Sequence, residues 1–481
     1  MKSNDIYDGI TDIRDDLIAG ANAEPKKRKR QIKQLWFSAV AAVLVFAVVG
    51  GIMFRSGGRV ELHTAAIAQA VYPEMVQYPS DPSDYAAIDA WYSSKAAQRR
   101  DLGDVSDLQS FFSRSSAAFL TDTEEKNKVY SPLNVYMALS MLAQVTDGQS
   151  REQILTLLGS DSMEDLRKRV NDVWNANYRD DGALTSILAN SLWLNENLEF
   201  KQDAMDILAE DFYASSYRGK MGSGEFNQAL QDWLNEQTGG LLQEQAGNVK
   251  MDRNTILALA STVYYTGKWN NDFWKEATAS QTFHTPTGDR EIDFMHQSEW
   301  DLYFWGDHFT SVRQRFETGG YMWFLLPEKG VTPEELLNDA EAQEFLFTND
   351  KYKNDWPKMH SLTINKSIPK FDVSSQFDLI SGLMSLGVTD VFDSTVSDFT
   401  PMLEDESIPV RVSEVSHAAR VLIDEDGSTA AAFTVIMMTE GAPTAPPEEE
   451  VDFVLDRPFL FCITGDSGLP LFVGVVNYPV E

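Results

Sequence analysis

Residue types that commonly carry out catalysis are few in this chain and do not cluster. The 481 residues include six scattered histidines, with no HExxH or GxSxG motif and no phosphate-binding loop. The single cysteine, Cys462, lies between apolar residues and excludes an internal disulfide. The run Glu448-Glu449-Glu450 follows two prolines, which favours a solvated loop over a metal site. We therefore expect no cofactor and no metal, and an enzyme of unrelated chemistry has no motif to support it.

One stretch combines the side chains of a strand with the surroundings of a loop. Residues 428–436 are small or β-capable, whereas Gly441, Pro443 and the prolines that follow are typical of an exposed loop. Such a segment could be held outside a sheet and later inserted into it. Alternate strand residues face the core, and one alternating set here is uniformly small: Ser428, Ala430, Ala432 and Thr434. The opposite set contains the larger Phe433. An ordinary alanine-rich linker is the alternative interpretation.

The composition limits the possible classes of protein. The formal net charge of -33 disfavours a nucleic-acid partner, because a phosphate backbone would repel this surface. The content of 43% hydrophobic and 11% aromatic residues is typical of a globular protein. Taken alone, the mixture of strand and helix patterns supports one large α+β domain.

The N-terminal region predicts a membrane anchor. Residues 1–34 form a charged tail, acidic at first and then basic, and residues 35–54 contain no charged side chain. Twenty residues make a helix of about 30 Å, which matches the hydrocarbon core of a bilayer. The basic cluster before this helix predicts a cytoplasmic N-terminus and an extracellular remainder. A cleaved signal peptide is the alternative, since Ala68-Gln69-Ala70 has the form of a cleavage site.

The rest of the chain divides into a connecting segment and a domain. Residues 55–105 contain glycines and prolines without a long apolar period and are interpreted as an extracytoplasmic stalk, from which Trp91 and Tyr92 could dock on the domain. From Ser106 onward, apolar residues at helical spacing open a large domain that runs to residue 481.

Blocks of this domain resemble those of the serpin family in type and in order. The similar blocks are VYSPLNVYMALSMLAQVTDGQSREQILTLLG (129–159), ANSLWLNENLEF (189–200), NQALQDWLNEQTGGL (227–241), TILALASTVYYTGKWNNDF (255–273) and the closing pair LDRPFLFCIT and LPLFVGVVNYP. The resemblance covers residues 106–481. It implies a serpin fold of three β-sheets with about nine helices, after the predicted membrane helix.

The resemblance also implies an activity. An inhibitory serpin presents a loop to a serine or cysteine protease, is cleaved, and inserts the freed hinge into its main sheet while the acyl-enzyme is trapped. A covalent complex with a serine protease and a monomeric inhibitor are therefore expected. The residues that match the inhibitory hinge are Glu425, Gly427, Ser428, Thr429, Ala430, Ala431, Ala432 and Thr434.

Four further residues match the parts of the family that control insertion. Ser131 and His417 correspond to the serine and histidine of the family's shutter, whereas Ser261 stands where the family usually has asparagine. Trp269 matches the tryptophan at the point where the loop enters the sheet. A satisfied core histidine and an ordinary core tryptophan are the alternatives for His417 and Trp269.

The family's spacing from Glu425 places the reactive bond between Gly441 and Ala442. The loop is longer than usual after this point, so Met438, Thr439 and Glu440 remain alternatives for the specificity residue. A small residue at the bond indicates an elastase-like or subtilisin-like target. No Lys or Arg occurs between Arg420 and Arg457, which disfavours trypsin-like enzymes.

The sequence thus predicts a membrane-tethered protease inhibitor displayed outside a cell, which we expect to be bacterial. A non-inhibitory serpin that acts as a binding or structural module is the alternative.

Overall fold

The computed structural model describes residues 66–81, 83–121, 126–317, 319–413, 415–428 and 449–479. The chain divides into two units after Arg59, and all described residues belong to the second unit, Val60–Glu481. The tail and membrane helix predicted at 1–34 and 35–54 lie outside the described residues. Within the described ranges, no helix has the length and apolarity that crossing a bilayer requires.

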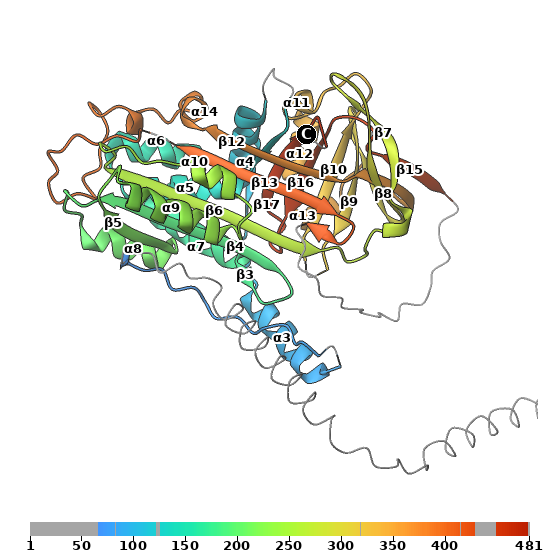
Figure 1. Ribbon diagram of the computed structural model, residues 1–481, viewed down its shortest axis with the longest axis horizontal. Coiled ribbons are helices and arrows are strands. Elements are labelled where there is room, and N and C mark those ends of the chain that lie inside the picture. The colour runs from blue at the N-terminus through green and yellow to red at the C-terminus, as the bar shows by residue number, and fades with distance from the viewer. Residues whose placement is uncertain are drawn as a thin grey trace, which may run out of the picture. The chain divides into compact units, whose positions relative to one another are not determined.

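Two large β-sheets form the framework (Figure 1). The eight-stranded sheet contains, in spatial order, β1 (Ala66–Ala68), β5 (Ala214–Gly219), β4 (Thr185–Asn195), β6 (Leu257–Lys268), β14 (Gly427–Ser428), β13 (Ser416–Asp424) and β12 (Phe371–Asp378), with β3 (Arg179–Asp180) beside β4. The nine-stranded sheet contains β15 (Glu450–Val454), β11 (Met359–Pro369), β8 (Gly288–Trp305), β9 (Phe309–Arg315), β10 (Tyr321–Pro327), β16 (Phe459–Thr464), β17 (Pro470–Val476) and β2 (Lys128–Tyr130), with β7 (Ala279–Thr285) beside β8.

The expected three sheets are therefore two in the described part of the chain, and the long strand β8 is the reason. This strand of 18 residues pairs with β11 along most of its length, while its last residues, Phe304 and Trp305, pair with β9. Strand β8 thus joins β11 and β9 in one continuous sheet.

The described residues contain 12 α-helices instead of about nine, together with the short 3₁₀ turns η2 (Lys275–Ala277) and η3 (Asp390–Phe392). The helices are α3 (Tyr85–Gln98), α4 (Ser106–Leu120), α5 (Pro132–Gln144), α6 (Gly148–Leu158), α7 (Met163–Asn177), α8 (Gln202–Asp211), α9 (Gly224–Gln237), α10 (Gln243–Asn248), α11 (Pro333–Leu336), α12 (Ala340–Phe347), α13 (Asp350–Lys353) and α14 (Ile380–Ser385). Four of these have only four to six residues, too short to show a helical period in the sequence.

The main core lies between the two sheets, and α5 runs through it. The sequence begins this helix with Ser131 as N-cap, whose side chain accepts a hydrogen bond from the backbone N–H of Asn134, and with Pro132 in the first turn. Every residue of α5 except Ala138 is buried, and the helix packs against both β6 and β17. A second, smaller core joins α9 to the other face of β4. The eight-stranded sheet is thus covered by helices on both faces.

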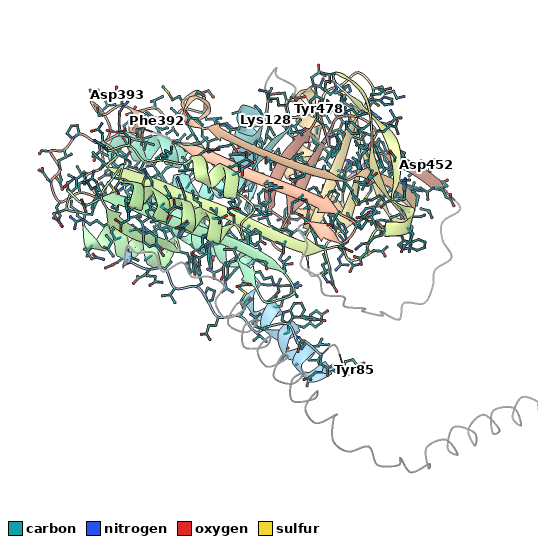
Figure 2. All side chains as sticks on the ribbon, viewed as in Figure 1. Tyr85, Lys128, Phe392, Asp393, Asp452 and Tyr478 are labelled. Atoms are coloured by element: carbon teal, nitrogen blue, oxygen red, sulfur yellow. The ribbon has the colours of Figure 1, made fainter. Side chains whose placement is uncertain are left out.

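The segment interpreted as a stalk packs against the domain from Ala66 onward. Strand β1 pairs with the outer edge of β5, and the ring of Tyr72 stacks on Trp174 at 5.6 Å. Helix α3, which begins at Tyr85 (Figure 2), buries Trp91, whose indole Nε1 donates to Asp181 Oδ2 at 3.0 Å. The expected docking of Trp91 is confirmed. We call residues 66–98 the strap.

Candidate functional site

The candidate site is the seam between β6 and β13 at the centre of the eight-stranded sheet. Both strands pair with β14 in antiparallel fashion, so β6 and β13 run parallel to each other. Within the described residues, no backbone ladder joins β6 directly to β13; the two residues of β14 are the only link in the sheet. Among the described residues, the seam is therefore an interruption in the backbone pairing of the sheet, bridged at one end by Gly427 and Ser428.

Gly427 enters the seam at its tightest point. It pairs with Lys268 on β6 and with Asp424 on β13. A Cβ atom added to Gly427 would lie 2.3 Å from the backbone oxygen of Gly267. A side chain here would collide with the neighbouring strand, so the close approach requires glycine. Ser428 follows with a side chain small enough to be buried.

The turn before β14 is fixed by Glu425. Its Oε1 accepts hydrogen bonds from Thr278 Oγ1 and Lys370 Nζ, both at 2.6 Å. Burial acts to raise the pKa of Glu425, but the hydrogen bonds from Lys370 and Thr278 outweigh it and leave the pKa lowered. The carboxylate is therefore charged at neutral pH and ties the hinge to the loop before β7 and to the end of β11.

Trp269 lies next to the turn that precedes β14. Its indole Nε1 donates to the backbone oxygen of Asp424 at 2.9 Å, and its backbone N–H donates to the backbone oxygen of Asp426 at 3.2 Å. The ring stacks on Phe316 with centroids 4.8 Å apart. Trp269 is thus both a core aromatic and a direct contact of the hinge turn.

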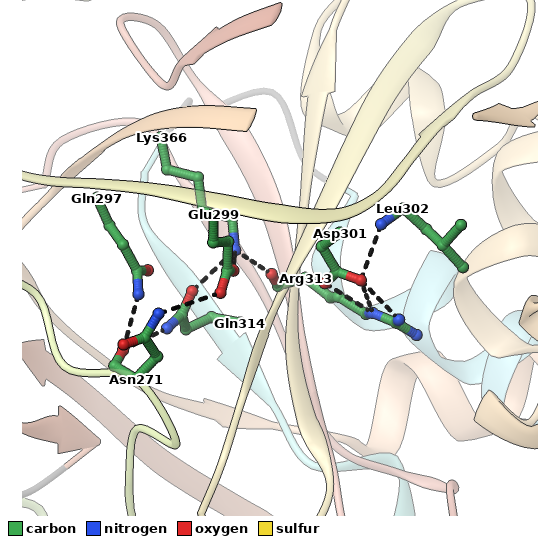
Figure 3. A network of polar contacts seen from close by, with 8 residues as sticks. All are labelled: Asn271, Gln297, Glu299, Asp301, Leu302, Arg313, Gln314 and Lys366. Carbon is green, nitrogen blue, oxygen red and sulfur yellow. Dashed lines mark hydrogen bonds and ion pairs between the residues drawn. The ribbon is translucent and has the colours of Figure 1, made fainter. Parts of the chain in front are cut away.

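A polar network that includes the buried side chains of Gln314 and Lys366 holds the turn after Trp269 in place (Figure 3). The backbone oxygen of Asn271 accepts hydrogen bonds from Gln314 Nε2 at 2.9 Å and from Gln297 Nε2 at 3.0 Å. Gln314 in turn accepts from Lys366 Nζ at 2.9 Å, and Lys366 also binds Glu299. Burial lowers the pKa of Lys366. Strands β8, β9 and β11 therefore position the turn that contacts the hinge.

Beneath the seam, on the core side, Ser131 and His417 are in contact. The backbone N–H of Ser131 donates to His417 Nε2 at 3.2 Å, and Ser131 Oγ donates to the backbone oxygen of Leu471 at 2.6 Å. His417 is buried, which lowers its pKa to about 4. The imidazole is therefore neutral at physiological pH and serves as a hydrogen-bond acceptor on β13.

Ser261 lies on β6 and joins the same helix from the other side. Its hydroxyl donates to Asn190 Oδ1 at 2.8 Å, and its backbone oxygen accepts from Asn134 Nδ2 at 2.8 Å. The first turn of α5 thus bridges β6 and β13 from beneath. We did not predict Asn134 and Asn190 from the sequence. A polar residue inside the buried strand 189–194, and one in the first turn of a buried helix, both require partners and were the available signal.

The outer side of the seam is spanned by the segment between α9 and α10. Arg420 on β13 donates from a guanidinium nitrogen to the backbone oxygen of Leu241 at 3.2 Å. Gln245 on α10 donates to Ser374 Oγ on β12 at 3.4 Å. Below this crossing, a cavity of about 110 Å³ is lined by β6 and α10 and by Ala418 of β13.

Several predicted site residues lie outside the described residues. They are the hinge residues Thr429, Ala430, Ala431, Ala432 and Thr434 and the bond candidates Met438, Thr439, Glu440, Gly441 and Ala442.

Comparison with known proteins decides the family. A model of the family described as "Serpin (serine protease inhibitor)" matches residues 108–479. The chain belongs to the serpin family. Serpin-ZX from Arabidopsis thaliana is 27% identical over 376 residues, which cover 75% of this chain and 94% of that serpin.

Solved serpin structures show the same fold. The thermophilic serpin tengpin in its native state gives a TM-score of 0.69 at 22% identity and covers 86% of this chain and 99% of its own. Arabidopsis AtSerpin1 in its native stressed conformation gives 0.67 at 25% identity, with 79% of this chain and 99% of its own covered. Members of the family are generally protease inhibitors and not enzymes.

Proposed function

We propose that this serpin is a suicide inhibitor of elastase-like or subtilisin-like serine proteases, with cysteine proteases as further possible targets. The single observation that supports the proposal is the seam, a parallel pair of strands joined only by the first two residues of the hinge among the described residues. Cleavage of the loop would free residue 429 onward to extend β14 along the seam. The trapped acyl-enzyme would be carried with it.

The register of β14 fixes where each hinge residue would go. Counting on from the pairs Gly427–Lys268 and Ser428–Ile423, the continued ladder would place Ala430 between Tyr265 and Val421, Ala432 between Val263 and Ala419, and Thr434 between Ser261 and His417. Directly paired residues share one face of a sheet. The flanking residues in this set are buried, apart from the half-buried Ser261. The small set of hinge residues would therefore face the core.

We further propose that cleavage occurs between Gly441 and Ala442. The spacing from Glu425 in the family supports this bond, and the small residues favour the small specificity pockets of elastase-like and subtilisin-like enzymes. Met438, Thr439 and Glu440 are the other candidates. Mass spectrometry of the peptide released from the cleaved chain identifies the bond directly.

The proposal is tested by mixing the full chain, in detergent, with elastase and with subtilisin. A denaturing gel should show a band of the summed mass, which demonstrates covalent trapping. Loop cleavage without such a band would contradict the inhibitory function for these enzymes and favour a non-inhibitory binding module.

Two neighbouring substitutions give a matched control. Ala432→Arg would place a charge against the core in the inserted strand, and we expect it to convert the inhibitor into a cleaved substrate. Ala431→Arg places the same side chain on the opposite face and should retain most of the covalent complex. Equal behaviour of the two variants would contradict the proposed register.

We also propose that residues 35–54 anchor the serpin domain on the outside of a cell membrane. The charge-free apolar run and its basic N-terminal flank support this orientation. Full-length chain should remain in the membrane pellet after carbonate washing, and the domain should be digested by protease added outside intact cells. Recovery in the soluble fraction would contradict the anchor.

A further inference from the structure

A groove of about 360 Å³ lies between the two points where the reactive loop leaves and rejoins the structure. One wall belongs to the segment after Trp269 and the other to β8 and β11. The lining includes Asn271, Trp274, Ala277, Ser298 and Asn365. Trp274 is 75% exposed, which is unusual for a tryptophan in a soluble domain.

The first wall is attached to the start of the loop. The backbone N–H of Phe273 donates to the oxygen of Glu425 at 3.1 Å, and Lys275 pairs with Asp426 at 2.6 Å. Trp274 lies between these two contacts in the sequence. It is therefore held directly beside the turn from which β14 and the loop depart.

The second wall is attached to the end of the loop. Strand β15, where the loop returns, pairs with β11 so that Asp452 faces Asn365, and Asn365 Nδ2 donates to Asp452 Oδ1 at 3.0 Å. Figure 2 marks Asp452 on β15. On the neighbouring strand β8, Trp300 shares the face of Ser298 and is 54% exposed.

The rim of the groove is acidic. Asp272, Glu276, Glu450 and Asp452 are exposed carboxylates on its two walls. Of the nearby lysines, Lys275 pairs with Asp426, Lys366 is buried against Glu299, and Lys268 acts on Asp272 through its charge. The groove thus combines an exposed aromatic side chain with an unbalanced negative charge.

We propose that this groove is a second docking surface for the target protease, and that it selects enzymes with a basic surface beside the active-site cleft. This inference rests on the proposed inhibitory function. A protease that holds the loop is tethered in the neighbourhood of the groove, because both ends of the loop are attached to the groove's walls. Exposed tryptophans are frequent anchors of protein interfaces, and the acidic rim would accelerate the encounter with a basic partner. Trp274 is the anchor and specificity comes from the rim.

The test measures docking separately from trapping. Neutrophil-type elastase with its active-site serine replaced by alanine cannot form an acyl-enzyme, so its binding to the full chain reports contacts alone. We expect Trp274→Ala to weaken this binding about tenfold, equivalent to about 1.4 kcal/mol. The affinity of the unmodified chain for the inactive elastase should also fall strongly as the salt concentration rises. Asp452→Asn should make the affinity less dependent on salt.

Trp305→Ala is the matched control. Trp305 is an exposed tryptophan as well, with 37% of its surface accessible, and it lies at the end of β8. It is seven positions along the strand from Ser298 in the groove, which corresponds to about 23 Å. The Trp305→Ala variant should bind the inactive elastase as tightly as the unmodified chain does. The variants Trp274→Ala, Asp452→Asn and Trp305→Ala should all keep the unfolding temperature of the unmodified chain.

Three results with the Trp274→Ala variant would overturn the proposal. They are unchanged binding by Trp274→Ala, tighter binding by Trp274→Ala because the groove holds the chain's own loop, and a dimer in sedimentation that this substitution dissociates. Absence of binding to the inactive elastase by the unmodified chain would overturn it as well. Docking that depends on Trp274 without a covalent complex with active elastase would instead overturn the inhibitory function and leave the groove in place.

Discussion

The eight-stranded sheet can accept an added strand at its outer edge beside β5 and at the seam between β6 and β13. The outer edge is closed by the strap, whose β1 pairs with β5 and whose Trp91 is buried against Asp181. Of the residues that the structure describes, Gly427 and Ser428 alone pair with both β6 and β13 at the seam. The outer edge is thus covered by a segment with its own aromatic anchors, whereas β6 and β13 have no direct ladder between them in the described part of the chain.

The difference lies in what each added strand contributes besides its backbone. The strap adds Tyr72 and Trp91, which bury large apolar area and make the attachment permanent. In the proposed inserted state, the hinge would add alanines and a serine, whose small side chains suit the buried face between the two strands. An exposed sheet edge must be covered, whereas a seam that accepts small residues can stay open until the loop is cut. We therefore predict that substitutions in the strap lower the stability of the intact and the loop-cleaved chain alike. Substitutions at the seam should instead affect the insertion of the cleaved loop.

Trp91→Ala should have the largest effect on stability. Loss of a buried tryptophan costs about 3–5 kcal/mol of unfolding free energy, and the strap stays in place when the loop inserts. We therefore expect the same loss in chemical unfolding of the intact and the loop-cleaved chain. A loss confined to the intact chain would make the strap part of the switch and break the comparison.

His417 predicts a dependence on pH that originates at the seam. Its folded pKa is lowered to about 4 from 6.5, so the unfolded chain binds a proton first as the pH falls. The contribution is constant above pH 6.5 and is lost as the pH falls towards 4, by at most about 1.4 kcal/mol per pH unit. Urea unfolding at a series of pH values should show this slope.

His417→Gln is the control for that slope, since glutamine can accept the hydrogen bond of Ser131 and does not titrate. It should flatten the curve between pH 6.5 and 4. A slope identical to that of the unmodified chain would assign the pH dependence to other groups.

Gly427→Ala should have a smaller effect, confined to the seam. The added Cβ would meet the oxygen of Gly267, and such overpacking costs about 1–3 kcal/mol. We expect β14 to leave the sheet, so the amide of Ser428 should exchange its hydrogen faster while that of Trp193 is unaffected. Protection of Ser428 at the level of the unmodified chain would show that the seam tolerates a side chain there.

The sequence was sufficient to predict the serpin family and the helix that begins at Ser106, because long motif blocks and apolar periods carry that information. The resemblance also made Ser131 the partner of His417, and in the structure the backbone N–H of Ser131 donates to His417 Nε2. The polar residues that complete the cluster, Asn134 and Asn190, were not predicted.

The features that the sequence did not predict involve strands that are unusually short or unusually long. Strand β1 has three residues and β14 has two, so neither shows a period, and their place depends on the partner strand alone. The strap was therefore interpreted as a stalk. Strand β8 has the opposite difficulty, because 18 residues are enough to join two sheets and no local pattern shows where the partner changes.

The most direct test of the account is disulfide trapping of the inserted strand in its register. The chain is suited to it because its only cysteine, Cys462, is buried, which raises the pKa of the thiol to about 12. In the proposed register, residue 432 faces Ala419, and directly opposite strand residues are close enough for a disulfide.

After the loop is cut by subtilisin, Ala419→Cys with Ala432→Cys should form a disulfide, and Ala419→Cys with Ala431→Cys should not. The disulfide is read by mass spectrometry of the digested chain, with uncut chain as the reference. A disulfide at 431 instead of 432, or none at either position once the loop is cut, would contradict insertion along the seam.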